Sequence, residues 1–211
     1  MLTVITPATS TALASLERAA TDLGVTAGSK RDRQIVRYIE QASRVIVDHC
    51  RRPFGLETVR ETFIVNEIRG DGPLFGRGPV VEILAVRDGS GTLIAPSGYV
   101  VDHSTGRLRC LDANGFPQPW GWDWGSGLSV EYRAGYVLPT DDEDGNLPEP
   151  IERACVLLVA TYLAAQGRDP TVKVDTVEGL GSRSFYVAGA DDKLVTPEAQ
   201  QLLAPFVRFY P

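Results

Sequence analysis

The segment from Ala154 to Ala165 constrains the fold more than any other part of the chain, because it is a helix-forming run without a charged residue. Pro148-Glu-Pro150 precedes it, and proline is favoured at the first turn of a helix. A helix on the surface of a lone domain carries polar residues along its outer face, whereas a helix that is apolar all round needs cover on more than one face. We therefore expect this helix to pack against several neighbours, including copies of the same chain.

Composition and charge exclude several classes of protein. The chain has 211 residues, of which 43% are hydrophobic and 23% charged, as is usual for soluble globular proteins. Its net charge is −6, whereas a protein that grips nucleic acid over its whole surface needs a dense basic footprint. An acidic wall repels phosphate, so DNA could still slide past such a protein.

The three cysteines, Cys50, Cys110 and Cys155, are far apart and form no CxxC pair. A disulfide framework or a zinc site is therefore not expected, and a reducing cytoplasm at the time of folding fits the sequence. No apolar run is long enough to span a membrane.

Helical periodicity predicts four helices. The first begins near Ser10, a good N-cap, and stops at Gly24. The second begins at Ser29, where Asp32 completes a capping box, and runs to about residue 51. The third covers about 149–166, and a short fourth helix is capped by Thr196.

The middle of the chain alternates apolar and polar residues, as β-strands do, with Gly and Pro in the gaps. We expect an α+β fold: a small helical bundle of three main helices plus a short C-terminal helix, with an inserted antiparallel β module. The helical part comprises residues 1–57 and 147–211, the β module residues 58–136, and an acidic loop residues 137–146. The expected strands are 58–65, 80–86, 92–94, 99–102, 107–111 and 128–132.

Catalytic and metal-binding readings of the sequence are weak. Asp102-His-Ser-Thr-Gly106 holds an acid, a base and a hydroxyl, but neighbours on one turn cannot form the geometry of a catalytic triad. We interpret Asp102–Gly106 as a polar hairpin turn. We interpret His49 as a residue at the end of a helix, where a partly charged imidazole suits the C-terminal end of the helix dipole.

Two loops imitate ligand sites without fitting them. Gly70–Gly78 has the wrong spacing for a phosphate loop and leads into a strand. Asp141–Asn146 lacks the glycine and glutamate that an EF-hand needs, although a weak surface cation site stays open. We therefore expect no enzyme, no metal and no cofactor.

The Trp120-Gly-Trp-Asp-Trp124 segment allows two interpretations. Exposed aromatic rings on a loop stack on sugars or bases, which would make the β module a carbohydrate-binding or ligand-binding module. Alternatively, Trp120, Trp122 and Trp124 fold back on the sheet or lie in a contact between subunits, where tryptophan is enriched.

Two motifs in order along the chain resemble a known family. Val130-Glu-Tyr-Arg-Ala-Gly-Tyr136 is followed by Leu147-Pro-Glu-Pro-Ile-Glu-Arg-Ala154 and an apolar helix to Tyr162. This arrangement resembles the head–tail connector, or adaptor, family of long-tailed phages and gene transfer agents. The start of the chain, the two N-terminal helices, Gly179–Tyr186 and Leu202–Phe206 are similar to that family too.

The resemblance implies a structural virion protein of the neck, assembled in the host cytoplasm. Members form a ring, usually a dodecamer, that bridges the portal to a stopper or tail-completion protein, and DNA passes through the lumen unread. It implies portal docking through Phe206, Phe209 and Tyr210, since a few aromatic residues dominate such contacts. For the interface between copies we expect Leu157, Leu158 and Tyr162 together with the three tryptophans.

Overall fold

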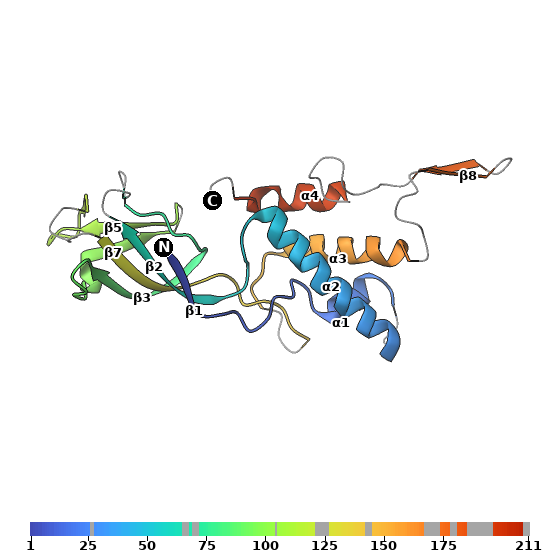
Figure 1. Cartoon of the computed structure of the whole chain (residues 1–211), viewed down its shortest axis with the longest axis horizontal. Helices are drawn as coiled ribbons and strands as arrows, with labels where there is room; N and C mark the ends of the chain where they lie inside the picture. The colour runs from blue at the N-terminus through green and yellow to red at the C-terminus, as the bar shows by residue number, and fades with distance from the viewer. Residues whose placement is uncertain are drawn as a thin grey trace. The chain divides into compact units, whose positions relative to one another are not determined.

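The computed structural model describes residues 1–25, 28–64, 68, 72–103, 105–120, 127–141, 145–166, 174–177, 181–184 and 196–208. It divides into two compact units, each described by itself below (Figure 1). The β-sheet unit comprises Met1–Ser10 and Pro53–Val137, and the helical unit Thr11–Arg52 and Leu138–Pro211. Helices and antiparallel sheets together confirm the α+β class.

The main sheet of the first unit has four antiparallel strands in the order β1-β2-β7-β3. Its strands are β1 (Leu2–Thr6), β2 (Glu57–Ile64), β7 (Gly127–Ala134) and β3 (Val80–Asp88). One face of β7 is buried and the other is not, as the alternation in its sequence predicts. On the polar face, Arg60 of β2 forms an ion pair with Glu131 of β7 at 2.9 Å.

The start of the chain differs from the sequence-based expectation. We assigned residues 1–57 to the helical part, but β1 lies in the sheet and pairs with β2, with Leu2 opposite Glu61. Five residues carry too short a pattern to mark a strand, and the partner strand follows only after two helices. The partner strand, Glu57–Ile64, otherwise closely matches the predicted one.

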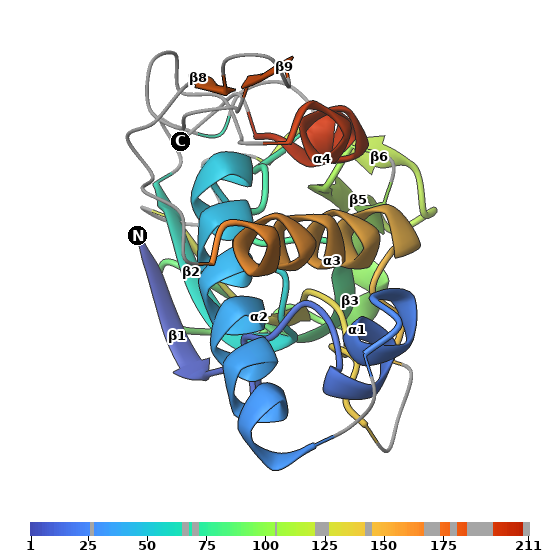
Figure 2. The ribbon, with the colours of Figure 1, turned by 90° about the vertical axis from the view of Figure 1, so that its right-hand side faces the viewer.

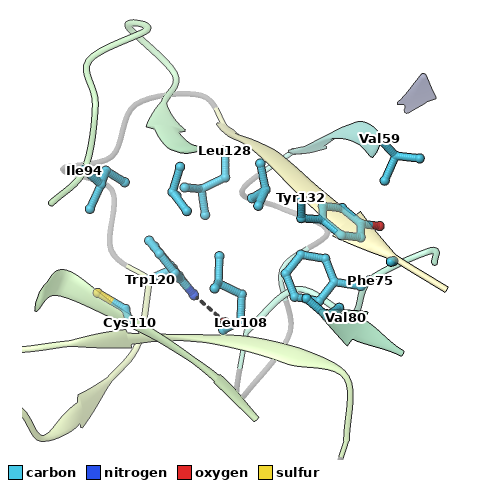
Figure 3. Close-up of a cluster of buried hydrophobic side chains, with 12 residues drawn as sticks. Val59, Phe75, Val80, Ile94, Leu108, Cys110, Trp120, Leu128 and Tyr132 are labelled. Atoms are coloured by element: carbon cyan, nitrogen blue, oxygen red, sulfur yellow. Dashed lines mark hydrogen bonds between the residues drawn. The ribbon is translucent and has the colours of Figure 1, made fainter. Parts of the chain in front are cut away.

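A second layer closes the core of this unit. It consists of β4 (Tyr99–Asp102), β5 (Arg107–Leu111) and β6 (Pro117–Gln118), with a short 3₁₀ turn, η2 (Pro96–Gly98), before β4. Expected strand 92–94 contributes only one bridge, from Leu93 to Arg87. Figure 3 shows the apolar side chains that fill the unit, which come from the main sheet, from β5 and from the loops. They are Val59, Phe75, Val80, Val86, Ile94, Leu108, Cys110, Trp120, Leu128, Val130, Tyr132 and Ala134.

The helical unit begins with an irregular segment before its first helix. Helix α1 spans Leu16–Asp22, and its N-cap is Ser15, whose hydroxyl accepts a hydrogen bond from the Arg18 amide at 3.1 Å. The predicted start at Ser10 was wrong, because the Leu13 amide donates to the Ser43 hydroxyl at 2.9 Å and so lies outside the helix.

Helix α2 spans Ser29–Cys50, and its apolar residues follow the helical period. Its apolar residues recur at intervals of three and four and are buried, as helical spacing requires. Gly28 is the N-cap, and the Asp32 carboxylate accepts from its amide at 3.1 Å. The predicted capping box with Ser29 as the cap was therefore wrong, because Ser29 is the first residue of the helix itself. Arg51 ends the helix in the left-handed conformation, just before Pro53.

Helix α3 (Glu149–Ala164) crosses α2, as Figure 2 shows, and helix α4 (Pro197–Leu203) packs along α3. Thr161 of α3 and Thr196, the N-cap of α4, share a hydrogen bond of 3.1 Å. A 3₁₀ turn, η4 (Ala204–Phe206), follows α4. Strands β8 (Val174–Val177) and β9 (Gly181–Ser184) form a separate two-stranded sheet.

The turn after β7 should tolerate no side chain at Gly135. This residue has φ of +113°, and a Cβ there would run into the carbonyl oxygen of Gly55. We expect Gly135→Ala to lower the free energy of unfolding by about 3 kcal/mol or more, from strain and steric conflict together. Gly91→Ala is the matched control, because Gly91 also has a positive φ, +89°, but open space around it. That control should cost about 1 kcal/mol in urea unfolding followed by circular dichroism, and equal losses would contradict the steric explanation.

Candidate functional site

The apolar helix α3 is covered mainly by its own chain. It packs against α2 and α4 and touches α1. Ile151, Ala154 and Leu158 are completely buried within the single chain. The inference that this helix needs copies of the chain to cover it is therefore not supported by the structure. The reason is that three helices of the same unit surround it, an arrangement that composition alone does not reveal.

The expected interface residues of α3 consequently separate into two groups. Leu158 lies in the core and is not available to a partner. Leu157 and Tyr162 are half-buried, and the Tyr162 ring lies 5.7 Å from that of Tyr38 between centroids. Burial raises the pKa of the Tyr162 hydroxyl. Leu157 and Tyr162 thus stay candidates for a contact between copies.

Substitution of the two leucines tests this division. Leu158→Ala should lower the free energy of unfolding of the isolated chain by about 2–5 kcal/mol, because it leaves a cavity. Leu157→Ala, the matched control next to it, should cost well under half as much in the same chemical denaturation measurement. Similar losses for both would mean that α3 is oriented differently.

Trp120 belongs to the core of the β-sheet unit. It is 8% exposed, and its indole Nε1 donates to the carbonyl oxygen of Leu108 at 3.0 Å (Figure 3). The buried indole is satisfied by this bond, as buried tryptophans usually are. For Trp120, the structure therefore supports the interpretation that the tryptophan folds back on the sheet, and not that of an exposed ligand platform. Trp122 and Trp124 lie outside the described residues.

The expected docking segment begins in the described part of the chain. Phe206 is half-buried in η4, and the amide of Arg208 donates to the carbonyl oxygen of Cys50 at 3.0 Å. This bond attaches the segment after α4 to the end of α2. Phe209 and Tyr210 lie outside the described residues, so their docking role stays a prediction.

In the Asp102–Gly106 turn, the described residues make structural contacts. The Asp102 carboxylate forms an ion pair with Arg109 at 2.8 Å and accepts from the Thr105 amide at 3.3 Å. His103 is exposed. At His49, desolvation lowers the pKa, so burial works against the partial charge that we expected there.

The other sequence candidates have structural roles where they are described. Phe75 of the Gly70–Gly78 loop lies in the core, and the Gly76 amide donates to Glu61 at 2.8 Å. Within the described ranges, no group of His, Cys, Asp or Glu side chains could hold a metal ion. Nor does that part of the chain contain a helix both long and apolar enough to cross a membrane.

The three cysteines are buried and free. Desolvation raises the pKa of Cys155 from 9.0 to about 12 and that of Cys50 from 9.0 to about 11. A thiol with so high a pKa is a poor nucleophile. These residues are therefore core side chains, as the sequence indicated for Cys155.

Alkaline pH should destabilise the fold through Cys155. In the unfolded chain its thiol ionises near pH 9, whereas the folded thiol keeps its proton to about pH 12. The full stability is therefore present below pH 9 and is lost as the pH rises through this window, by up to about 1.4 kcal/mol per pH unit. Urea unfolding from pH 8.5 to 11 should show a smaller slope for Cys155→Ala than for the wild type. Identical slopes would place the thiol in a solvated site.

Sequence reasoning missed a pair of oppositely charged surfaces on the helical unit. The outer face of α2 carries exposed Arg33, Arg37 and Arg44 at helical spacing. Beside α1 lies a groove of about 450 Å³. The groove is lined by Leu16, Glu17, Ala20, Thr21, Val25, Asp32 and Asp141.

Spacing would have revealed the arginines, because positions 33, 37 and 44 share one side of a helix. The groove could not have been found, because its lining comes from three separate segments. The Asp141 carboxylate accepts from the Glu17 amide at 3.0 Å, which joins the loop before α3 to the first turn of α1.

Comparisons with known proteins give matches in solved structures. No family model matches the sequence, and no curated protein matches it. A chain in the neck of an empty gene transfer agent (GTA) particle, computed with C6 symmetry, has a TM-score of 0.58 and 19% identity. A chain in the virion of the native GTA particle has a TM-score of 0.57 and 17% identity. A chain in the neck of the native particle, computed with C12 symmetry, has a TM-score of 0.53 and 18% identity.

Each match covers 100% of this chain and 97% of the other. The likeness therefore includes the β-sheet unit and the helical unit, and it confirms at the level of the fold the resemblance stated from the sequence. This chain is an α+β protein with the fold of chains found in the neck and virion of gene transfer agent particles.

Proposed function

We propose that this chain is a structural neck protein, a head–tail adaptor that forms a ring below the portal of a DNA-filled head. The observation that carries the proposal is the match of its fold, over the whole chain, to chains in GTA particles, including two structures of the neck. The order of the sequence motifs around Tyr136 and Pro148 supports the same function independently.

The ring is supported by the symmetry of the matched structures, which were computed with C6 and C12 symmetry. In a closed ring, each copy contacts its two neighbours through two different faces. We propose a dodecamer that bridges the portal to a stopper or tail-completion protein. The net charge of −6 suits a channel through which DNA moves, because an acidic wall does not hold phosphate.

In this proposal the role is mechanical and not enzymatic, and the protein acts in the virion neck. Phe206 and the two aromatic residues that follow at 209 and 210 would insert into the portal. The bond from Arg208 to Cys50 would place that segment beside the C-terminal end of α2. A carbohydrate-binding role for the 120–124 segment is less supported, because Trp120 lies in the core.

Deletion of the gene tests the proposal. We expect particles without this chain to be filled heads that lack tails and lose DNA, as seen by cryo-electron microscopy, because no bridge closes the portal. A plasmid copy of the wild type should restore tailed particles. A copy with Phe206→Ala, Phe209→Ala and Tyr210→Ala should not restore them, although the purified triple variant should fold.

Native mass spectrometry of the purified chain with the portal of the same particle provides the direct measurement. A complex with the portal ring is expected for the wild type. Normal tailed particles after deletion, or no complex with the portal, would contradict the adaptor role.

A further inference from the structure

The outer face of α2 is basic in a protein that is acidic as a whole. Residues 29–52 contain seven basic and three acidic side chains, although the chain has a net charge of −6. Arg37 and Arg44 are exposed, and neither takes part in an ion pair within the described ranges. With exposed Arg33 they form a stripe, which we call the arginine stripe.

The helix dipole does not favour the first member of the arginine stripe, Arg33. The N-terminal end of a helix carries partial positive charge and disfavours cations. Yet Lys30, Arg31 and Arg33 all lie within the first five residues of α2, which begins at Ser29. Near the C-terminal end, Arg51 and Arg52 follow the helix and are favourable there. Arg33 is therefore not placed by the dipole, whereas Arg37 and Arg44 lie in the helix interior, beyond its reach.

The groove beside α1 has the opposite charge and an apolar floor. Leu16, Ala20 and Val25 provide apolar surface, and the carboxylates of Glu17, Asp32 and Asp141 line the same groove. No basic residue lines it. Among the cations next to its acids in the sequence, Arg18 is engaged by Asp22 at 3.2 Å and by Glu149 at 3.7 Å, whereas Arg31 and Arg33, which flank Asp32, are exposed. We call this surface the acidic groove.

We infer that the arginine stripe of one copy docks in the acidic groove of the next copy. The inference rests on the proposed ring and names the two faces that form it. Guanidinium groups would pair with the carboxylates of the groove, and the aliphatic stems of the arginines would cover its apolar floor. The stripe and the groove are different surfaces of one unit, as an interface that repeats head to tail requires.

A second copy fits the arginine stripe better than DNA does. Glu40 and Asp48 are exposed on the same side of α2, between and beyond the arginines, and would repel phosphate. Because the chain carries both charges of the pair, copies of it are complementary to each other.

Charge reversal of each surface tests the contact in the purified full-length chain. The stripe variant is Arg37→Glu with Arg44→Glu, and the groove variant is Glu17→Arg with Asp141→Arg. Sedimentation equilibrium should show self-association of the wild type that weakens with salt. Each variant alone should associate at least about tenfold more weakly, because like charges then face each other.

Complementation makes the test specific. A mixture of the two variants should recover association, because the reversed stripe fits the reversed groove and the two native surfaces fit each other. A chain with all four substitutions should also recover it. The control, Arg60→Glu with Arg87→Glu, makes the same change in net charge as the stripe variant at exposed arginines of the β-sheet unit, and should leave association unchanged.

Three results would overturn the inference. They are a wild type that stays monomeric at about 1 mM in low salt, single-surface variants that associate like the wild type, and variants that do not recover on mixing. Loss of binding to a duplex oligonucleotide in the stripe variant, with self-association unchanged, would assign the stripe to DNA. Because the assay contains this chain alone, its failure is distinct from failure of the neck role, which the deletion measures.

Discussion

The helical unit depends on the burial of α3 against the helices of its own chain. The buried polar residue Ser43 lies at this contact. Its hydroxyl donates to the carbonyl oxygen of Ile39 at 2.7 Å, accepts from the Leu13 amide at 2.9 Å, and lies 3.8 Å from the Cys155 sulfur. One small side chain thereby fixes the segment before α1 and the packing of α3 on α2. A satisfied polar group in an apolar core specifies one arrangement, because misplacing it leaves unpaired donors and acceptors.

Local patterns predicted much of the fold. The apolar spacing of α2, the prolines at the start of α3 and α4, and the alternation in β2 and β7 act over a few residues, so the sequence alone placed these elements well. Contacts between distant segments were not predictable in the same way. Nothing in Leu2–Thr6 shows that it adds to β2, and nothing in the sequence around Trp120 shows that its indole bonds to Leu108 of β5.

The candidate site shows the same limit. An apolar helix carries no polar residue to mark its outer face, so Leu157 and Leu158 were indistinguishable in the sequence. The structure separates them, with Leu158 in the core and Leu157 half-buried. Net charge was equally uninformative about surfaces. The value of −6 is a sum over the whole chain, and it hides the contrast between a basic α2 and a strongly acidic segment, Asp141–Glu152, of the same unit.

If the chain forms the proposed ring, the burial of α3 and the charged surfaces of the helical unit serve the same assembly. If α3 presented its apolar face to solvent, copies would associate as soon as they were made, since apolar burial is strong and not specific in direction. With α3 covered, association between copies would instead depend on charged contacts, which water and salt weaken. Two copies on their own would associate only weakly through such contacts. In a ring each copy has two of them, and a template that gathers the copies raises their effective concentration. An adaptor with a covered apolar helix and complementary charged faces would therefore assemble where the portal presents it, and not in free solution at low concentration.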